Sequence, residues 1–248
     1  MNAPFTSLAL TAILAVSWVP VLAGEARLLL NPSPDSLEDN GLPKGWQMLR
    51  FQNVAKPTDY SVGLDGEGMA LKAVSQASAS GIYTEVDVDA NDYPLITWEW
   101  KVANLIEKGD ATTKNGDDFP ARIIVAFHYD LVQASLFKRM KYEFIRLIYG
   151  RYPPGSALLY VWDNRLPVGT VIDNANTSWA KMVILESGPS KVAQWVSERR
   201  NFFEDYVKAF GSHPPRLKFI GIMTDTDDTG EQATAYYRHL SIERSGER

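Results

Sequence analysis

Short apolar runs that alternate with polar residues recur along this chain of 248 residues, and this alternation limits the possible folds more than any other feature. From Ile82 to Val88 and from Ile96 to Val102, every second residue is apolar or threonine, and the residues between are mostly polar. Successive side chains of a strand point to opposite faces of a sheet, so this spacing predicts strands with one buried face. Further runs predict strands over residues 46–51, 69–74, 121–129, 157–162, 179–186, 216–223 and 233–242.

The connections between these runs favour an all-β fold. Gly, Pro, Asn and Asp residues separate the predicted strands, and the 17 Gly and 14 Pro are spread along the chain. About ten short strands joined by such turns are typical of two packed sheets. We therefore expect a jelly-roll-like two-sheet β-sandwich with one or two helices at its edge.

Two segments predict those helices. Residues 131–149 place apolar side chains on one face, between Asp130, which can cap a helix, and Gly150, which can end it. This segment is basic, because Lys and Arg side chains greatly outnumber its one Glu. The second segment, Ser197–Phe210, has an apolar face and is followed by Gly211 and two prolines.

The N-terminus predicts export. Residues 8–23 are mostly apolar, and Val21-Leu22-Ala23 fits the small-residue rule for signal-peptidase cleavage. No Lys or Arg precedes the apolar run, so an uncleaved anchor is the alternative. We expect residues 1–23 to be a signal peptide and residues 24–248 to be a single domain in the periplasm or outside the cell.

Composition and motifs exclude several classes of function. The net charge of -5 argues against nucleic acid as a partner, since phosphate binding needs a basic face. With no cysteine, the chain has neither disulfides nor a thiol nucleophile, which suits a bacterial envelope protein held together by its core. The three histidines show no metal-ligand spacing, and the sequence has no phosphate-binding glycine loop.

Two groups of aspartates stand at the ends of strands predicted to be central. The first group follows the run 216–223 and consists of Asp225, Asp227 and Asp228. The second precedes the run that begins at residue 121 and consists of Asp117 and Asp118. Adjacent carboxylates raise one another's pKa unless a cation or several N–H donors compensate them. We expect the two groups to converge on one polar, ligand-binding site.

The sequence leaves open what compensates these carboxylates. A bound Ca²⁺ is one interpretation, with Asp225 and Asp227 as its hard oxygen ligands. The other is a structural loop, in which Asp and Thr side chains bond turn amides and a nearby guanidinium. Arg122 and Arg199 are the arginines expected close to the site.

The aromatic residues point to a sugar-like ligand. Trp98 and Trp100 share the apolar face of their predicted strand, so we expect them in the core. Trp162, beside Asp163 and Asn164, and Trp179 stand near strand ends. Sugar rings are commonly held by a stacked aromatic ring together with polar side chains that bind the hydroxyls. Trp162 is therefore a candidate ligand-binding residue, and a partly buried position is the alternative.

Several short motifs together resemble a known family. They include Gly41-Leu-Pro-Lys-Gly-Trp46, Pro94-Leu-Ile-Thr-Trp-Glu-Trp100, Leu159-Tyr-Val-Trp162, Glu198-Arg-Arg-Asn201 and Met223-Thr-Asp-Thr-Asp-Asp-Thr-Gly230. Their combination, over residues 41–242, resembles a bacterial domain-of-unknown-function family, number 3047. The resemblance implies an exported single-domain protein and supplies no activity.

These observations leave three functions open. The favoured one is a non-catalytic, carbohydrate-binding module with an Asp-rich site, for which Ca²⁺ is the one cofactor suggested. The second is a polysaccharide hydrolase that uses two carboxylates. Its candidate residues are Glu99, Glu186, Asp117 and Asp225. The third is an envelope scaffold whose basic helix 131–149 contacts a membrane surface or another protein.

Overall fold

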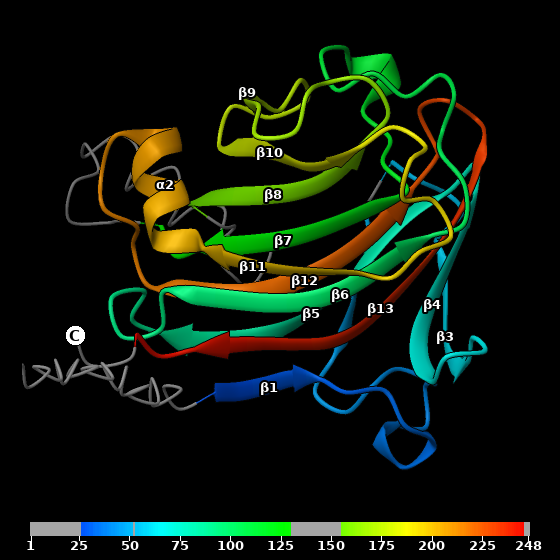
Figure 1. Cartoon of the computed structure of the whole chain (residues 1–248), viewed down its shortest axis with the longest axis horizontal. Coiled ribbons are helices and arrows are strands. Elements are labelled where there is room, and N and C mark those ends of the chain that lie inside the picture. Colours follow the sequence, from blue (N-terminus) through cyan, green and yellow to red (C-terminus); the bar gives the residue numbers. More distant parts are fainter. Residues whose placement is uncertain (1–25, 52, 130–154, 246–248) are drawn as a thin grey trace, which may run out of the picture.

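The strands divide between two facing sheets (Figure 1). The computed structural model describes residues 26–51, 53–129 and 155–245. One sheet has the order β11 (Val196–Asn201), β6 (Leu95–Val102), β13 (Gln232–Glu243), β4 (Met69–Gln76) and β3 (Asp59–Leu64), with β1 (Ala26–Leu30) paired to β13. The other has the order β2 (Gln47–Leu49), β5 (Ala79–Val88), β12 (Leu217–Asp225), β7 (Ala121–Phe127), β8 (Ser156–Asp163), β10 (Ala180–Ser187) and β9 (Val171–Asp173). The predicted two-sheet β-sandwich is confirmed.

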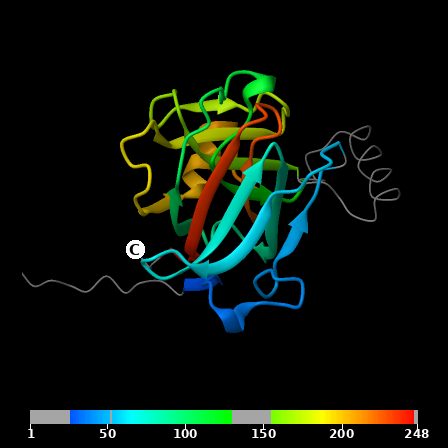
Figure 2. The same cartoon turned by 90° about the vertical axis from the view of Figure 1, so that its right-hand side faces the viewer.

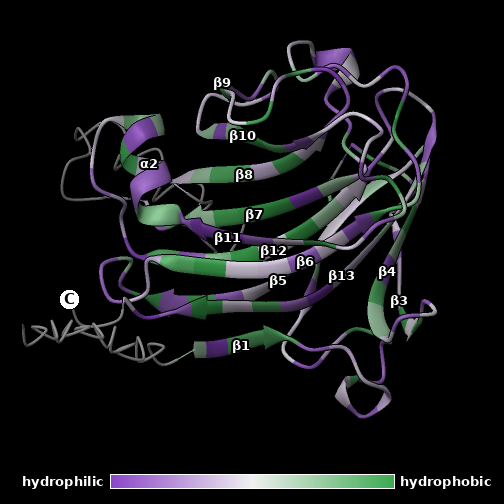
Figure 3. Cartoon of the chain, viewed as in Figure 1, coloured by the Kyte–Doolittle hydropathy of each residue, from purple (hydrophilic) through white to green (hydrophobic). Residues whose placement is uncertain are grey.

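Most neighbouring strands are antiparallel, and β8 and β10 form a parallel pair. Figure 2 shows β13, β4 and β3 side by side, as their pairing requires. Between the sheets lies the main core, in which Trp98 and Trp100 are buried as expected and meet edge to face at 5.4 Å. Hydrophobic and hydrophilic residues alternate along several strands (Figure 3), which is the pattern that divides the core from solvent.

A short helix closes one end of the sandwich in the described residues (Figure 1). This helix, α2 (Phe202–Phe210), packs Phe202 and Tyr206 against Phe127, with ring centroids 6.1 and 4.7 Å apart. The predicted helix over residues 197–210 is wrong in its first part, because residues 197–201 belong to β11 and pair with β6. The helix begins only where the Asn201 side chain caps it, and it ends at Gly211, which has a φ of 72°.

Two other predicted segments, the signal peptide at 1–23 and the basic helix at 131–149, lie outside the described residues. No helix in the part of the chain that the structure describes is long and apolar enough to cross a membrane.

The seven-stranded sheet also has an apolar outer face. Side chains there form a second cluster, separate from the main core, which includes Ile124, Leu159, Met182 and Met223. β7 and β8 are buried along their whole length, because one of their faces packs in the main core and the other carries side chains of this second cluster. The candidate site lies on this face.

Candidate functional site

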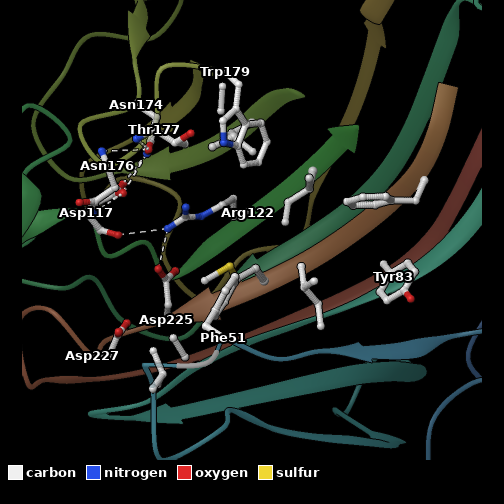
Figure 4. Close-up of a pocket in the computed structure, with 18 of the residues that line it drawn as sticks. Phe51, Tyr83, Asp117, Arg122, Asn174, Asn176, Thr177, Trp179, Asp225 and Asp227 are labelled. Atoms are coloured by element: carbon white, nitrogen blue, oxygen red, sulfur yellow. Dashed lines mark hydrogen bonds and ion pairs between the residues drawn. The ribbon is translucent and has the colours of Figure 1, made fainter. Parts of the chain in front are cut away.

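A groove with a volume of 620 Å³ lies over the outer face of the seven-stranded sheet (Figure 4). Its floor is apolar and is formed by side chains of β7, β8 and β12, namely Ile124, Leu159 and Met223. Aromatic residues also line it, namely Phe51, Tyr83, Trp179 and Phe219. Trp179 is 41% exposed and Phe51 is 37% exposed, so both rings are accessible to a ligand.

One end of this groove is polar, because the pairing of β7 with β12 brings the two aspartate groups together. Met223 of β12 lies opposite Arg122 of β7, and Asp225 ends β12 two residues later. Arg122 Nη2 lies 2.6 Å from Asp225 Oδ2 and donates to the carbonyl oxygen of Asp117 at 3.2 Å. Both side chains of the ion pair are buried.

The same contact decides which predicted arginine belongs to the site. Arg122 lies among the aspartates, whereas Arg199 lies on β11 of the other sheet, where its Nη2 is 3.0 Å from Glu243 Oε2. The prediction that Arg199 contributes to this site is therefore wrong, because residues 197–201 are a strand at the far edge of the six-stranded sheet instead of a helix.

Backbone and amide donors fix two further carboxylates of the polar end. Asp118 Oδ2 accepts a hydrogen bond from Thr229 N at 2.6 Å, which ties the loop before β7 to the turn after β12. Asp117 accepts hydrogen bonds from Asn174 Nδ2 at 2.8 Å and from Asn176 Nδ2 at 2.9 Å. The two asparagines could not be identified from the sequence. Their loop is Asn-rich, but nothing in the sequence places it beside β7.

Burial and like charge shift the pKa values at this end of the groove. Burial raises the pKa of Asp225, and the charge of Arg122 opposes this shift. Burial and the nearby Asp118 raise the pKa of Asp227. Burial, with the carboxylates of Asp227 and Asp118, raises the pKa of Asp228 to about 6. Although burial opposes it, the neighbouring carboxylates raise the pKa of Arg122, which therefore stays positive.

Three of these carboxylates could hold a cation. Asp118, Asp227 and Asp228 each offer an oxygen atom within 4.8 Å of the others, and carboxylate oxygens are the ligands that Ca²⁺ prefers. This group contains Asp227 of the predicted metal pair. It does not contain Asp225, whose carboxylate is paired with Arg122. Ca²⁺ at Asp227 stays a prediction, and Asp225 is better explained by the guanidinium.

Trp162 does not line the groove. Its ring is fully buried in the main core, 5.9 Å from the ring of Trp100. The prediction that Trp162 binds a ligand is therefore wrong, because alternation along β8 turns this side chain toward the core and Leu159 toward the groove. Trp179, directly before β10, is the tryptophan that lines the groove.

The four carboxylates predicted as hydrolase candidates do not all lie in one groove. Asp117 and Asp225 line the groove. Glu99 lies on the other sheet, where its Oε2 is 2.5 Å from Arg238 Nε. Glu186 is the next-to-last residue of β10, and its Oε1 lies 2.6 Å from Lys191 Nζ. Neither glutamate lines the groove.

A comparison with protein families gives one match that covers most of the chain. The model of a family described as "Protein of unknown function (DUF3047)" matches residues 44–241. A comparison with curated proteins gives no match.

Solved structures with a similar fold include carbohydrate-binding modules. One is the family 11 carbohydrate-binding module of the Clostridium thermocellum cellulosomal cellulase Lic26A-Cel5E, with 10% identity and a TM-score of 0.44 over 91% of this chain and 98% of that one. A match of another kind is the xyloglucanase domain of NopAA from Sinorhizobium fredii, with 5% identity and a TM-score of 0.41 over 81% of this chain and 98% of that one. These similarities concern the fold alone.

Proposed function

The chain belongs to the DUF3047 family, whose function is unknown, and from its groove we propose that it is a non-catalytic module that binds carbohydrate. The observation that carries this proposal is the combination, in one groove, of exposed aromatic rings and a polar end with both donors and acceptors. Because the sequence predicts a signal peptide, we also propose that the protein acts in the periplasm or outside the cell.

The aromatic walls supply the apolar half of a sugar site. Trp179 and Phe51 expose their rings at the groove, and Tyr83 and Phe219 lie with their ring centroids 5.2 Å apart along it. The C–H face of a sugar ring can stack on such rings, and covering exposed aromatic area is favourable. A flat saccharide placed along the groove would therefore remove rings of both walls from water.

The polar end supplies the hydrogen-bonding half. Sugar hydroxyls both donate and accept, so a site needs carboxylates together with N–H donors. Asp117 and Asp227 offer acceptors, and Arg122 and Asn176 offer donors, all within the lining of the groove. Hydrogen bonds from Asn174 and Asn176 already hold Asp117 in place, which lowers the ordering cost that a ligand must overcome.

A glycan array of soluble oligosaccharides, followed by calorimetry on the best ligand, tests this proposal. We expect Trp179→Ala to weaken binding about tenfold, as the loss of one stacked ring predicts. Leu64→Ala is the matched control, because Leu64 is 81% exposed on β3 of the other sheet, and it should bind like the parent protein. An array without any bound glycan, or a Trp179→Ala variant that binds normally, would refute the proposal.

A second candidate function is carboxylate-dependent hydrolysis, and one feature of the site favours it. Burial and the neighbouring Asp227 raise the pKa of Asp228 to about 6, and a general acid must keep its proton near the working pH. Asp117 would be the partner base in this case. Release of new reducing ends from the bound glycan, abolished in Asp228→Asn, is the result that would replace the binding function with this one.

The third function, an envelope scaffold that contacts a membrane surface or a protein through the basic helix 131–149, depends on residues outside those described. It stays a prediction. Co-sedimentation of the protein with anionic vesicles at low and high salt tests its lipid form.

A further inference from the structure

The polar end of the groove carries an excess of negative charge. Among the described residues that line it, four are aspartates, namely Asp117, Asp225, Asp227 and Asp228, and Arg122 is the one arginine. Asp118 adds a further carboxylate close to Asp227 and Asp228. A concave site with apolar walls focuses the field of such charges, so this end favours a ligand group that brings positive charge.

Arg122 supplies an independent indication of a ligand. The residue is only 6% exposed and lines the groove. Its Nη2 donates to Asp225 and to the Asp117 carbonyl, whereas its Nε is buried without a hydrogen-bond partner among the described residues. A buried donor without an acceptor is costly, so the guanidinium favours a ligand that brings an acceptor oxygen to this end.

The two requirements together define a chemical class. Resting on the carbohydrate function proposed above, we propose that the groove recognises an amino sugar. Its ammonium group lies among the carboxylates of Asp117, Asp227 and Asp228, and a neighbouring hydroxyl oxygen accepts from the Arg122 guanidinium. The rest of the sugar lies against Trp179.

Other saccharide classes fit this end less well. An acidic sugar would bring a carboxylate toward the four aspartates of the lining, which repel it more than Arg122 attracts it. A neutral hydroxyl satisfies the hydrogen bonds but leaves the charge uncompensated. Asp118, Asp227 and Asp228 each offer an oxygen atom within 4.8 Å of the others, and a bound ammonium compensates these crowded charges.

A series of β-1,4-linked tetramers with one backbone tests the inference by calorimetry. The tetramers carry an ammonium, a hydroxyl or an acetamido group at the second carbon of each ring. At low salt and pH 6.5, we expect the ammonium tetramer to bind at least about tenfold more tightly than the other two, as a charge-assisted hydrogen bond predicts. The preference should shrink at high salt, because the site is open to solvent screening.

Two variants and one further probe make the outcomes distinct. Asp228→Asn should reduce the preference for the ammonium tetramer, while the exposed Asp92→Asn, a control outside the groove lining, should keep it. Hexylamine, an ammonium without a sugar, is the further probe.

Equal binding of the three tetramers would overturn the amino-sugar inference and leave the carbohydrate function standing. Binding of hexylamine without any tetramer would overturn both the carbohydrate function and the amino sugar, and would leave only an ammonium site. Binding of the ammonium tetramer above the others, lost in Asp228→Asn, supports both.

Discussion

The Arg122 guanidinium lies beside a buried carboxylate, with its Nη2 2.6 Å from Asp225 Oδ2. Removing one partner of a buried ion pair leaves the other charge without compensation, which typically costs about 3–5 kcal/mol. We therefore expect Arg122→Met to lower the free energy of unfolding by about that amount, measured by urea denaturation. Arg199→Met is the control, since the Arg199 side chain of the Arg199–Glu243 pair is 61% exposed and its loss should lower stability by less than about 1 kcal/mol. Equal losses in the two variants would contradict this account of the site.

Asp228 makes the stability of the folded protein depend on pH. In the folded protein its pKa is raised from 3.8 to about 6, so the folded state binds a proton that the unfolded chain has already lost. Ionisation of Asp228 therefore costs stability as the pH rises through this window. We expect Asp228→Asn to match the parent protein in melting temperature near pH 4 and to exceed it above pH 6. A difference in melting temperature that does not change with pH would show that folding does not raise the pKa of Asp228.

At the scale of elements, the strands inside the sheets could be predicted from the sequence, but of the edge strands only β2, within the predicted run 46–51, could be. The apolar runs of β7 and β12 mark these strands because both lie inside a sheet. The sequence of β11 predicts the start of a helix instead, because Glu198, Arg199 and Arg200 of this edge strand mask its alternation. β1, β3 and β9 also lie at the margins of their sheets and were not predicted, since an edge strand needs few buried side chains.

The convergence of the aspartate groups was predicted from the energetic cost of unpaired carboxylates, but its geometry was not. It depends on the register that places Met223 opposite Arg122, and sequence does not give the pairing of strands far apart in the chain. Trp162 and Trp179 show the same limit at the level of a single side chain. Which tryptophan enters the groove depends on which sheet face outside the main core is left open, and periodicity cannot decide this.

The start of α2 gives a prediction for an element. Asn201 Oδ1 accepts a hydrogen bond from Glu204 N at 3.1 Å, so this side chain caps the helix where β11 ends. Replacement of an N-cap Asn by Ala typically costs about 1 kcal/mol, and we expect Asn201→Ala to lose that much in urea denaturation. Asn201→Asp should retain the stability, because a carboxylate caps equally well and favours the positive helix N-terminus. Similar losses in both variants would mean that Asn201 acts through the β11 pairing.

The whole molecule combines a main core between the sheets with an apolar outer face on one of them. The alternation along each strand is local, and for this reason the two-sheet fold could be predicted. The order of the strands is not local, since β12 has β5 and β7 as neighbours. The groove lies over the apolar outer face of this sheet, so the main core lies on one side of the sheet and the candidate site on the other.

The predicted cleavage after Ala23 can be tested against the architecture of the whole molecule. It would leave β1 intact, because this strand begins at Ala26 and pairs with the long strand β13. We expect intact mass to identify the exported protein as residues 24–248. A chain retaining residues 1–23 would support the uncleaved anchor instead.

A chain shortened further, to residues 31–248, should lose at least about 2 kcal/mol of unfolding free energy. It lacks the buried Leu30. It also lacks the Leu29 carbonyl oxygen, which accepts a hydrogen bond from Trp46 Nε1 at 3.0 Å. In the chain of residues 24–248, Leu30→Ala should reproduce much of this loss, while Leu28→Ala should change little, because Leu28 is 59% exposed and Leu30 only 1%. If the shortened chain were as stable as residues 24–248, β1 would contribute nothing to the stability of the sandwich. The fold would then not require cleavage to occur before β1.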